Sequence, residues 1–338
     1  MRTNKMMSAM VLKKAKSPLQ LAQVPIPQPG SQQVLIQVAA CGVCRTDLHI
    51  VDGELPSPKL PLILGHQIVG CIVQLGAHVD SFQLGQRVGV PWLGKACGTC
   101  SYCLDGQENL CDNALYTGYQ IDGGFAEYCV ADARFIFPLP PTYSDLEAAP
   151  LLCAGLIGYR ALRLAGQVKR IGFYGFGSSA QLLTQIAVHR GSEVYAFTRP
   201  GDTKKQAVAL ALGAVWAAGT DILPPHPLDA AIIFAPIGEL IPFALQAVKK
   251  GGTVICAGIH MSDIPCFSYD LLWGERILRS VANLTRQDGH ELLALARRIP
   301  IKTHFRIYPL EELNQAIQDV RHGQLSGTTI VVPSSQQQ

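Results

Sequence analysis

The stretch Ile171-Gly172-Phe173-Tyr174-Gly175-Phe176-Gly177-Ser178-Ser179-Ala180 joins an apolar run of strand length to a glycine turn and then to a helical segment. A strand that runs through Gly-x-Gly into a helix is the setting of a dinucleotide fingerprint, because the glycines permit a tight turn and a close approach to a pyrophosphate. Ala180 occupies the third position, where alanine is tolerated. A plain tight turn is the competing interpretation. The predicted cofactor contacts are Gly175, Gly177, Ser178 and Ser179.

The sequence after residue 170 alternates between strand and helix patterns. Such alternation is typical of a parallel sheet with crossover helices, and it favours a doubly wound α/β domain. The predicted strands are 171–174, 193–197, 228–234, 253–257 and 280–283, and the predicted helices are 181–189, 203–212 and 240–249.

The sequence before residue 139 has a different character. Short β-rich segments at 34–39, 68–74, 87–90 and 126–130 are separated by Gly, Pro and Asp, which predicts an antiparallel, barrel-like domain. The tail has helical periods at 289–298 and 310–322 and a strand pattern at 328–332, and we expect it to rejoin the first domain. Two domains also agree with the length of 338 residues, because single cores stop growing at roughly 250 to 300 residues.

Charge and hydropathy exclude several classes of partner. Lys and Arg number 28 against 25 Asp and Glu, a net charge of +3, and the basic residues form no cluster of nucleic-acid type. The sequence contains no apolar run of the roughly 18 to 20 residues that cross a membrane. These features predict a cytoplasmic protein that binds neither nucleic acid nor membranes.

Four cysteines form a compact cluster with the order C-x2-C-x2-C-x7-C in a polar, loop-like stretch. Four thiolates without an open position are typical of a structural zinc site. An iron–sulfur cluster is the competing interpretation, but the ferredoxin run has three residues before its fourth cysteine and a proline after it. Here seven residues intervene and Asp112 follows. The cluster consists of Cys97, Cys100, Cys103 and Cys111.

A second set of metal-ligating types is dispersed along the chain. Cys44 lies in Cys-Gly-Val-Cys-Arg-Thr-Asp-Leu-His, His66 lies in Gly-His-Gln-Ile-Val-Gly, and Cys153 follows Pro-Leu-Leu. Taken singly, each agrees with a packed core residue. Their occurrence beside a four-cysteine cluster favours a second metal site.

With these motifs, the chain from residue 34 to 332 resembles the zinc-dependent alcohol dehydrogenases of the medium-chain dehydrogenase/reductase family. The resemblance implies a GroES-like catalytic domain at 1–152, to which 285–338 returns, and a Rossmann domain at 153–284. It also implies two zinc ions per chain, with Cys44, His66 and Cys153 as ligands of the catalytic ion and the four-cysteine cluster around the structural one.

The resemblance assigns further roles to residues next to Cys44. It implies that Thr46 and His49 carry the alcohol proton outward through the nicotinamide ribose, since a hydroxyl both donates and accepts and histidine titrates near neutral pH. An N-cap role for Thr46 and a surface position for His49 are the alternatives. Asp47 is expected to orient His66 by accepting its second ring proton.

The chain departs from the family pattern at several positions. Gln67 follows the ligand histidine where a glutamate is usual, so we expect altered turnover rather than loss of metal. Ile157 and Thr328 stand where a threonine and an arginine contact the cofactor. The acidic residue expected about 20 residues after the fingerprint is replaced by Thr198-Arg199, which favours NADP(H) over NAD.

The predicted function is hydride transfer between a primary or secondary alcohol, or the matching aldehyde or ketone, on the catalytic zinc and NAD(P). The alternative is a catalytically weak redox sensor that binds zinc and NAD(P), suggested by the departures at 67, 157 and 328. The predicted assembly is a homodimer or homotetramer, with 280–284 as a contact. The expected pocket wall includes Trp92, Leu115, Tyr116 and Trp273.

Overall fold

The computed structural model describes residues 5–323 and 327–333, and the chain divides into two compact units. Unit 1 comprises Met1–Cys153, Thr285–Arg298 and Lys302–Gln338, and unit 2 comprises Ala154–Leu284 and Ile299–Ile301.

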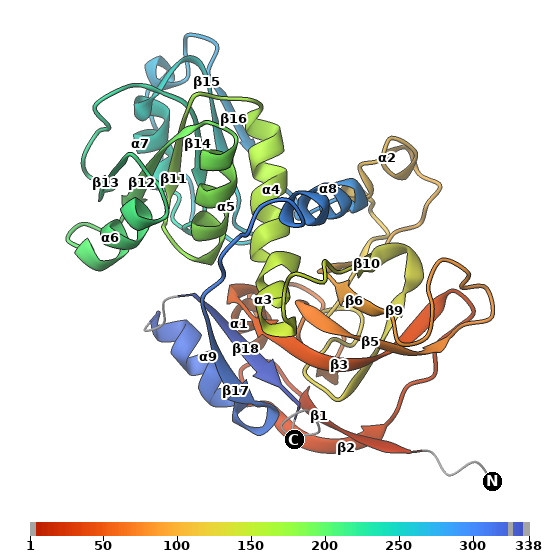
Figure 1. The fold of residues 1–338 in the computed structure, drawn as a ribbon. Helices are drawn as coiled ribbons and strands as arrows, with labels where there is room; N and C mark the ends of the chain where they lie inside the picture. The colour runs from red at the N-terminus through yellow and green to blue at the C-terminus, as the bar shows by residue number, and fades with distance from the viewer. Residues whose placement is uncertain (1–4, 324–326, 334–338) are drawn as a thin grey trace. The chain divides into compact units, whose positions relative to one another are not determined.

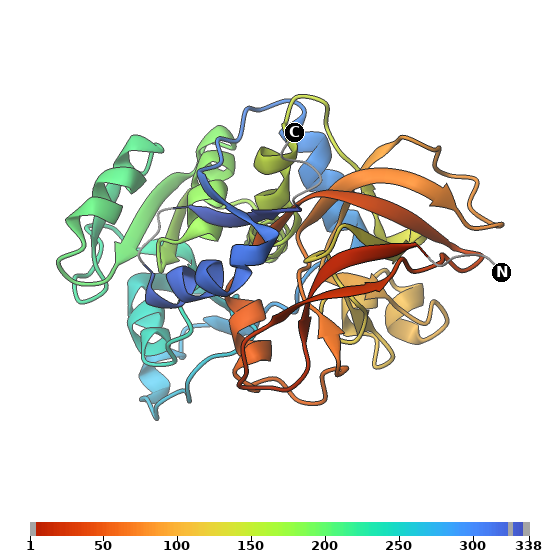
Figure 2. The same ribbon diagram turned by 90° about the horizontal axis from the view of Figure 1, so that it is seen from below.

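Unit 1 is rich in β-structure. Its principal sheet has the order β10-β6-β5-β3-β18-β17, with β9 also paired to β3, and smaller sheets have the orders β2-β1-β4 and β7-β8. Helix α9 lies against β17 and β18 in both views (Figures 1 and 2). The strands are β1 Met6–Leu12, β2 Gln20–Pro25, β3 Gln33–Val43, β4 Leu62–Ile63, β5 Ile68–Leu75, β6 Arg87–Val90, β7 Leu93–Lys95, β8 Leu115–Tyr116, β9 Tyr128–Asp132, β10 Phe137–Pro138, β17 Phe305–Pro309 and β18 Thr328–Val332. The helices are α1 Arg45–Val51, α2 Ser101–Leu104, α3 Asp145–Ala148, α8 Arg286–Ala296 and α9 Leu313–His322, with 3-10 turns η1 Glu108–Leu110, η2 Ala133–Phe135, η3 Ala149–Leu152 and η5 Leu310–Glu312.

Unit 2 is a six-stranded parallel sheet with the order β13-β12-β11-β14-β15-β16. Numbered within the sheet this is 3-2-1-4-5-6, the order of dinucleotide-binding folds. Helices α4 to α7 pack against the sheet (Figure 1). The predicted class, a Rossmann sheet together with a β-rich domain, is confirmed. The elements are α4 Ala154–Ala165, β11 Arg170–Tyr174, α5 Ser178–His189, β12 Glu193–Thr198, α6 Thr203–Ala211, β13 Trp216–Gly219, β14 Leu228–Ile233, α7 Leu240–Ala247, β15 Val248–Cys256, the 3-10 turn η4 Tyr269–Leu271 and β16 Ile277–Ser280.

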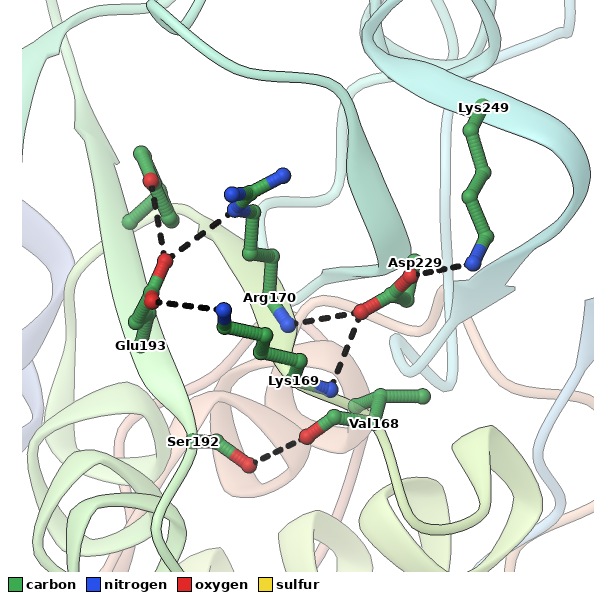
Figure 3. Close-up of polar contacts among 8 residues, drawn as sticks. Val168, Lys169, Arg170, Ser192, Glu193, Asp229 and Lys249 are labelled. Atoms are coloured by element: carbon green, nitrogen blue, oxygen red, sulfur yellow. Dashed lines mark hydrogen bonds and ion pairs between the residues drawn. The ribbon is translucent and has the colours of Figure 1, made fainter.

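An ionic network fastens the beginnings of the strands in unit 2 (Figure 3). The Asp229 carboxylate accepts hydrogen bonds from the backbone N–H groups of Lys169 and Arg170 at 2.9 and 2.8 Å, and it pairs with Lys249 Nζ at 2.5 Å. Glu193 pairs with Arg170 Nε at 3.1 Å. Ligands of parallel sheets bind at the opposite, carboxyl ends of the strands, so this network stabilises the fold rather than forming a site.

Several predicted element bounds were wrong. The sequence suggested no strand before residue 34, yet β1 and β2 form a hairpin there; every residue of β2 is at least partly exposed, which removes the apolar signal. The predicted strand 280–283 is β16 at Ile277–Ser280, an edge strand with no buried residue. The helix predicted for 240–249 ends at Ala247, because β15 begins at Val248.

Among the described residues, no single helix has the length and apolarity to cross a membrane; the bent pair Asp145–Leu152 and Ala154–Ala165 passes on length and composition alone.

Candidate active site

Three side chains of unit 1 converge although they lie far apart in sequence. Cys44 Sγ is 3.1 Å from His66 Nε2 and 4.0 Å from Cys153 Sγ, and all three ligand atoms lie within 4.8 Å of one another. Zn–S bonds of about 2.3 Å in a tetrahedron place two sulfur atoms about 3.8 Å apart. The two thiols and the imidazole therefore fit a zinc ion and leave its fourth position to another ligand.

Local structure explains how these three residues are placed. Cys44 follows the long strand β3 and caps helix α1, and its sulfur accepts the Thr46 backbone N–H at 3.3 Å. Gly65, with φ +97°, turns the chain before His66; a Cβ there would lie 2.8 Å from Cys41 Sγ.

The third residue, Cys153, directly follows η3. Gly89 in β6 leaves room for Leu152, since a Cβ at that glycine would lie 2.6 Å from the leucine side chain. This close packing of η3 on β6 holds Cys153 beside the other two ligands.

The three ligand side chains differ in their affinity for protons. The hydrogen bond from Cys153 lowers the pKa of Cys44 well below its ordinary value, against the effect of burial. Burial opposes protonation of His66, but the neighbouring Cys44 and Asp47 charges raise its pKa to about 10. The hydrogen bond with Cys44, together with burial and the Cys44 charge, raises the pKa of Cys153. A cation that binds all three residues would therefore displace protons.

Asp47 lies behind His66 and is completely buried. Its Oδ2 accepts the Cys44 backbone N–H at 2.9 Å and completes the capping box of α1, while Oδ1 lies 3.4 Å from His66 Nδ1. At that separation both atoms count as buried polar atoms without a hydrogen-bond partner among the described residues. The helix cap uses Oδ2, whereas Oδ1 faces the imidazole. The imidazole could therefore move slightly toward a bound metal without breaking the cap.

Gln67 is also buried, with 1% of its surface exposed. Neither its side-chain oxygen nor its nitrogen has a hydrogen-bond partner among the described residues. A Cβ at Gly42 would lie 2.8 Å from the Gln67 amide, so the glycine makes the space that this side chain occupies.

Aromatic rings surround the histidine ligand. Trp92 meets the His66 ring edge-on at 4.9 Å and stacks on Tyr116 at 5.1 Å and Tyr119 at 5.7 Å. Leu115 precedes Tyr116 in β8. The fourth residue of the predicted wall, Trp273, lies in unit 2, where 59% of its surface is exposed.

The predicted relay residues lie on helix α1. Thr46 and His49 are three residues apart and therefore share one face of the helix. His49 Nδ1 contacts the Glu54 carboxylate, a partner that the sequence motif does not reveal.

The four cysteines of the polar loop also converge on one point. Their sulfur atoms lie within 4.8 Å of one another, and Cys97 Sγ is 3.9 Å from Cys103 Sγ. The backbone N–H groups of Thr99 and Cys100 lower the pKa of Cys97 to about 6, whereas burial raises that of Cys103 to about 12. Four sulfur atoms gathered within 4.8 Å fit a closed structural zinc site.

The glycine turn of unit 2 has the backbone that the fingerprint requires. Gly175 has φ +88°, donates to the Phe197 carbonyl at 2.9 Å, and a Cβ there would lie 2.8 Å from the Ala235 nitrogen. Gly177 is the N-cap of α5 and contributes no side chain that covers the helix end, and Ser178 and Ser179 begin the helix.

Thr198 and Arg199 differ in accessibility. Thr198 is 1% exposed, and its hydroxyl donates to the Arg199 carbonyl at 3.0 Å and accepts from Gln206 Nε2 at 3.1 Å. Arg199 is exposed. The Thr198 hydroxyl is therefore hydrogen-bonded within the loop, and Arg199 is the more accessible of the two predicted phosphate contacts.

The sequence did not single out three residues that complete these sites. Tyr119 extends the aromatic stack, Glu54 contacts His49, and Glu108 pairs with Arg286 beside the four-cysteine loop. Gly53, just after the end of α1, is a helix-stop signal that could have pointed to the contact between Glu54 and His49.

Residues 30–141 match the model of the alcohol dehydrogenase GroES-like domain. A probable alcohol dehydrogenase of Mycobacterium tuberculosis is 42% identical over 324 residues, which cover 93% of each chain. Acetophenone reductase of Geotrichum candidum, solved with NAD, is 26% identical, with a TM-score of 0.88 and coverage of 98% of each chain. A protein of Sinorhizobium meliloti named a putative zinc-binding dehydrogenase, solved with NADP, is also 26% identical, with a TM-score of 0.86 and coverage of 97% of this chain and 100% of that one. The chain belongs to the zinc-type alcohol dehydrogenases of the medium-chain dehydrogenase/reductase family.

Proposed function

We propose that this alcohol dehydrogenase transfers hydride between a primary or secondary alcohol, or the matching aldehyde or ketone, and a nicotinamide dinucleotide at a zinc site made by Cys44, His66 and Cys153. The observation that carries this proposal is the convergence of these three ligand atoms within 4.8 Å. Zinc bound there would supply Lewis-acid chemistry that makes an alcohol hydroxyl more acidic.

The surrounding residues have distinct tasks. Asp47 holds the imidazole of His66 in the orientation that presents Nε2 to the ligand set. Thr46 and His49 accept and pass on the proton that the alcohol loses. The aromatic rings of Trp92, Tyr116 and Tyr119 favour an apolar substrate group next to the reacting carbon.

A second zinc ion in the four-cysteine loop would stabilise a segment that has little apolar core. Cys97, Cys100, Cys103 and Cys111 supply a complete ligand set, so this ion would not exchange ligands during catalysis.

The cofactor is proposed to bind unit 2 at its glycine turn. The pyrophosphate would meet Gly175, Gly177, Ser178 and Ser179 at the positive end of α5. The exposed guanidinium of Arg199 is suited to a 2′-phosphate, which favours NADP(H). Thr198 supports this loop through its own hydrogen bonds instead of contacting the phosphate.

The proposed assembly is a homodimer or homotetramer in the cytoplasm. Strand β16 is an unpaired edge of the sheet, and Ile277 on it and Ile264 and Trp273 near it in sequence are exposed by 51%, 51% and 59%. Exposed edges with apolar side chains pair readily with a second copy. Eleven free cysteines agree with a reducing compartment.

The test is a rate comparison of zinc-loaded enzyme with NADH and NADPH over short, branched and aromatic aldehydes, together with metal analysis. We expect two zinc ions per chain, and a higher kcat/KM with NADPH. Zinc-replete protein without activity on any aldehyde would instead support the weak redox sensor, which the alcohol dehydrogenase relatives do not favour.

A further inference from the structure

Helix α1 ends in a turn that folds Glu54 back onto His49. Gly53 adopts φ +71°, its N–H donates to the Ile50 carbonyl at 3.1 Å, and the Glu54 N–H donates to the His49 carbonyl at 2.9 Å. This pair of hydrogen bonds defines the Schellman motif, which fixes the two outer residues next to one another. The backbone therefore sets the approach of the Glu54 side chain to the His49 ring.

In such turns an apolar contact frequently joins these two positions. Here a charged contact replaces it, because Glu54 Oε2 meets His49 Nδ1. The histidine side chain is 12% exposed and the glutamate side chain 43% exposed. The imidazole is thus mostly buried, whereas the carboxylate that contacts it reaches the solvent.

Three other charged groups lie near His49, and one of them, Asp52, also interacts electrostatically with the His49 imidazole. Asp52 receives two hydrogen bonds from the Arg321 guanidinium of α9, both at 2.7 Å, and these lower its pKa. The Lys16 charge also lowers the pKa of Asp52, and the Glu54 charge raises the pKa of Arg321. Among Glu54, Asp52, Arg321 and Lys16, Glu54 is the group in direct contact with the His49 imidazole.

We propose that Glu54 is a positioning residue for the proton relay. Its carboxylate keeps the proton of neutral His49 on Nδ1 and turns the ring, so that Nε2 is the nitrogen that accepts the proton lost by the alcohol. The resulting imidazolium lies beside the carboxylate and then releases one proton to water, while Glu54 stays ionised. This inference rests on the proposed role of His49.

The test uses zinc-loaded, full-length enzyme with selectively ¹⁵N-labelled histidine. The His49 signals are assigned by their loss in His49→Gln. We expect the Nδ1–H tautomer in the wild type, and loss of this preference in Glu54→Gln, which keeps the side-chain shape but removes the charge. Glu54→Leu restores the apolar contact that the turn ordinarily carries, so the helix end should stay folded.

Steady-state kinetics provide the second measurement. We expect kcat for alcohol oxidation to fall about tenfold in both Glu54 variants, with the KM for alcohol and the zinc content unchanged. Glu312→Gln, at an exposed glutamate at the end of η5, is the matched control and should retain wild-type kcat and tautomer.

The two proposals fail in different ways. An unchanged kcat in His49→Gln would reject the relay itself. A reduced kcat in His49→Gln, with normal kcat and tautomer in both Glu54 variants, would overturn only the inference about Glu54. An Nε2–H tautomer in the wild type would also overturn it.

Discussion

The Glu108 carboxylate accepts two hydrogen bonds from Arg286 through a single oxygen, one from the backbone N–H at 2.9 Å and one from Nε at 2.8 Å. Glu108 belongs to the four-cysteine loop, and Arg286 begins α8, 178 residues later. The guanidinium also lies over the Phe135 ring at 5.3 Å. The loop is therefore fastened to the point at which the chain re-enters unit 1.

Glu108→Ala should lower the free energy of unfolding by about 2 kcal/mol, because Arg286 loses a charged partner that is only 3% exposed. Burial raises the pKa of Glu108, but the Arg286 hydrogen bonds and charge together lower it by more than burial raises it. The net shift of the pKa is therefore downward. Its stabilisation is thus complete above the ordinary glutamate pKa and is lost as the pH falls through the lowered value.

Denaturant unfolding at a series of pH values checks this expectation. The difference from wild type should be constant between pH 6 and 8 and shrink in acid. Asp105→Ala, an exposed acid in the same loop, is the control. An equal loss of unfolding free energy in Glu108→Ala and Asp105→Ala would show that the contact with Arg286 adds no stability beyond that of an exposed carboxylate.

Single substitutions should distinguish the two proposed zinc sites. Cys111→Ser should remove one zinc ion and lower Tm, since a structural ion contributes folding free energy. Cys153→Ser should remove the other zinc ion and abolish turnover, with a smaller change in Tm. Metal analysis and thermal unfolding measure both effects, and the exposed Cys266→Ser is the control. A single zinc ion in the wild type would contradict this prediction.

Asp47→Asn should weaken zinc binding at the catalytic site by about 10- to 100-fold, as loss of a carboxylate behind a histidine ligand does elsewhere. The amide retains an oxygen for the Cys44 backbone N–H, so α1 should remain capped. Competition with a chelator measures the zinc affinity. Asp80→Asn, at an exposed position, should behave as wild type, and an unaltered affinity in Asp47→Asn would argue against the orienting role.

Gln67→Glu should change turnover without loss of zinc. A carboxylate at this position would restore the charge that speeds ligand exchange, so we expect a severalfold higher kcat when product release limits the rate. The same carboxylate would be buried beside Gly42, and the cost of burying its charge should lower Tm.

Gln67→Leu provides the comparison. It removes two buried polar atoms that have no hydrogen-bond partner among the described residues, so Tm should stay level or rise while kcat does not increase. Equal kcat values in the wild type and both variants would show that this position does not influence turnover.

Arg199→Ala should lower the ratio of kcat/KM with NADPH to that with NADH by about tenfold, because the exposed guanidinium would no longer meet the 2′-phosphate. Initial rates with both cofactors measure the ratio. Thr198→Val is the contrasting variant, and its ratio should stay near that of the wild type, since the hydroxyl bonds to the Arg199 carbonyl and to Gln206. A larger effect from Thr198→Val would reverse the two assignments.

The sequence alone determined the features that depend on local spacing. The run from Ile171 to Ala180 predicted the strand, turn and helix of unit 2, and the Cys97–Cys111 spacing predicted a compact ligand cluster. Both are short-range patterns, because a glycine turn and closely spaced thiols constrain their own neighbourhood whatever the rest of the chain does. The family and the two-part fold class followed from these motifs and are confirmed.

Only the tertiary structure decided the contacts between distant segments and the availability of particular atoms. Cys44 and Cys153 meet across 109 positions, and Glu108 meets Arg286 across 178, because the packing of whole strands and helices brings them together. Edge strand β2 escaped prediction, and edge strand β16 was predicted three residues too late, because exposure leaves these strands no regular apolar pattern. Likewise the sequence showed a hydroxyl at Thr198, but only the folded loop shows that its hydrogen bonds are already made.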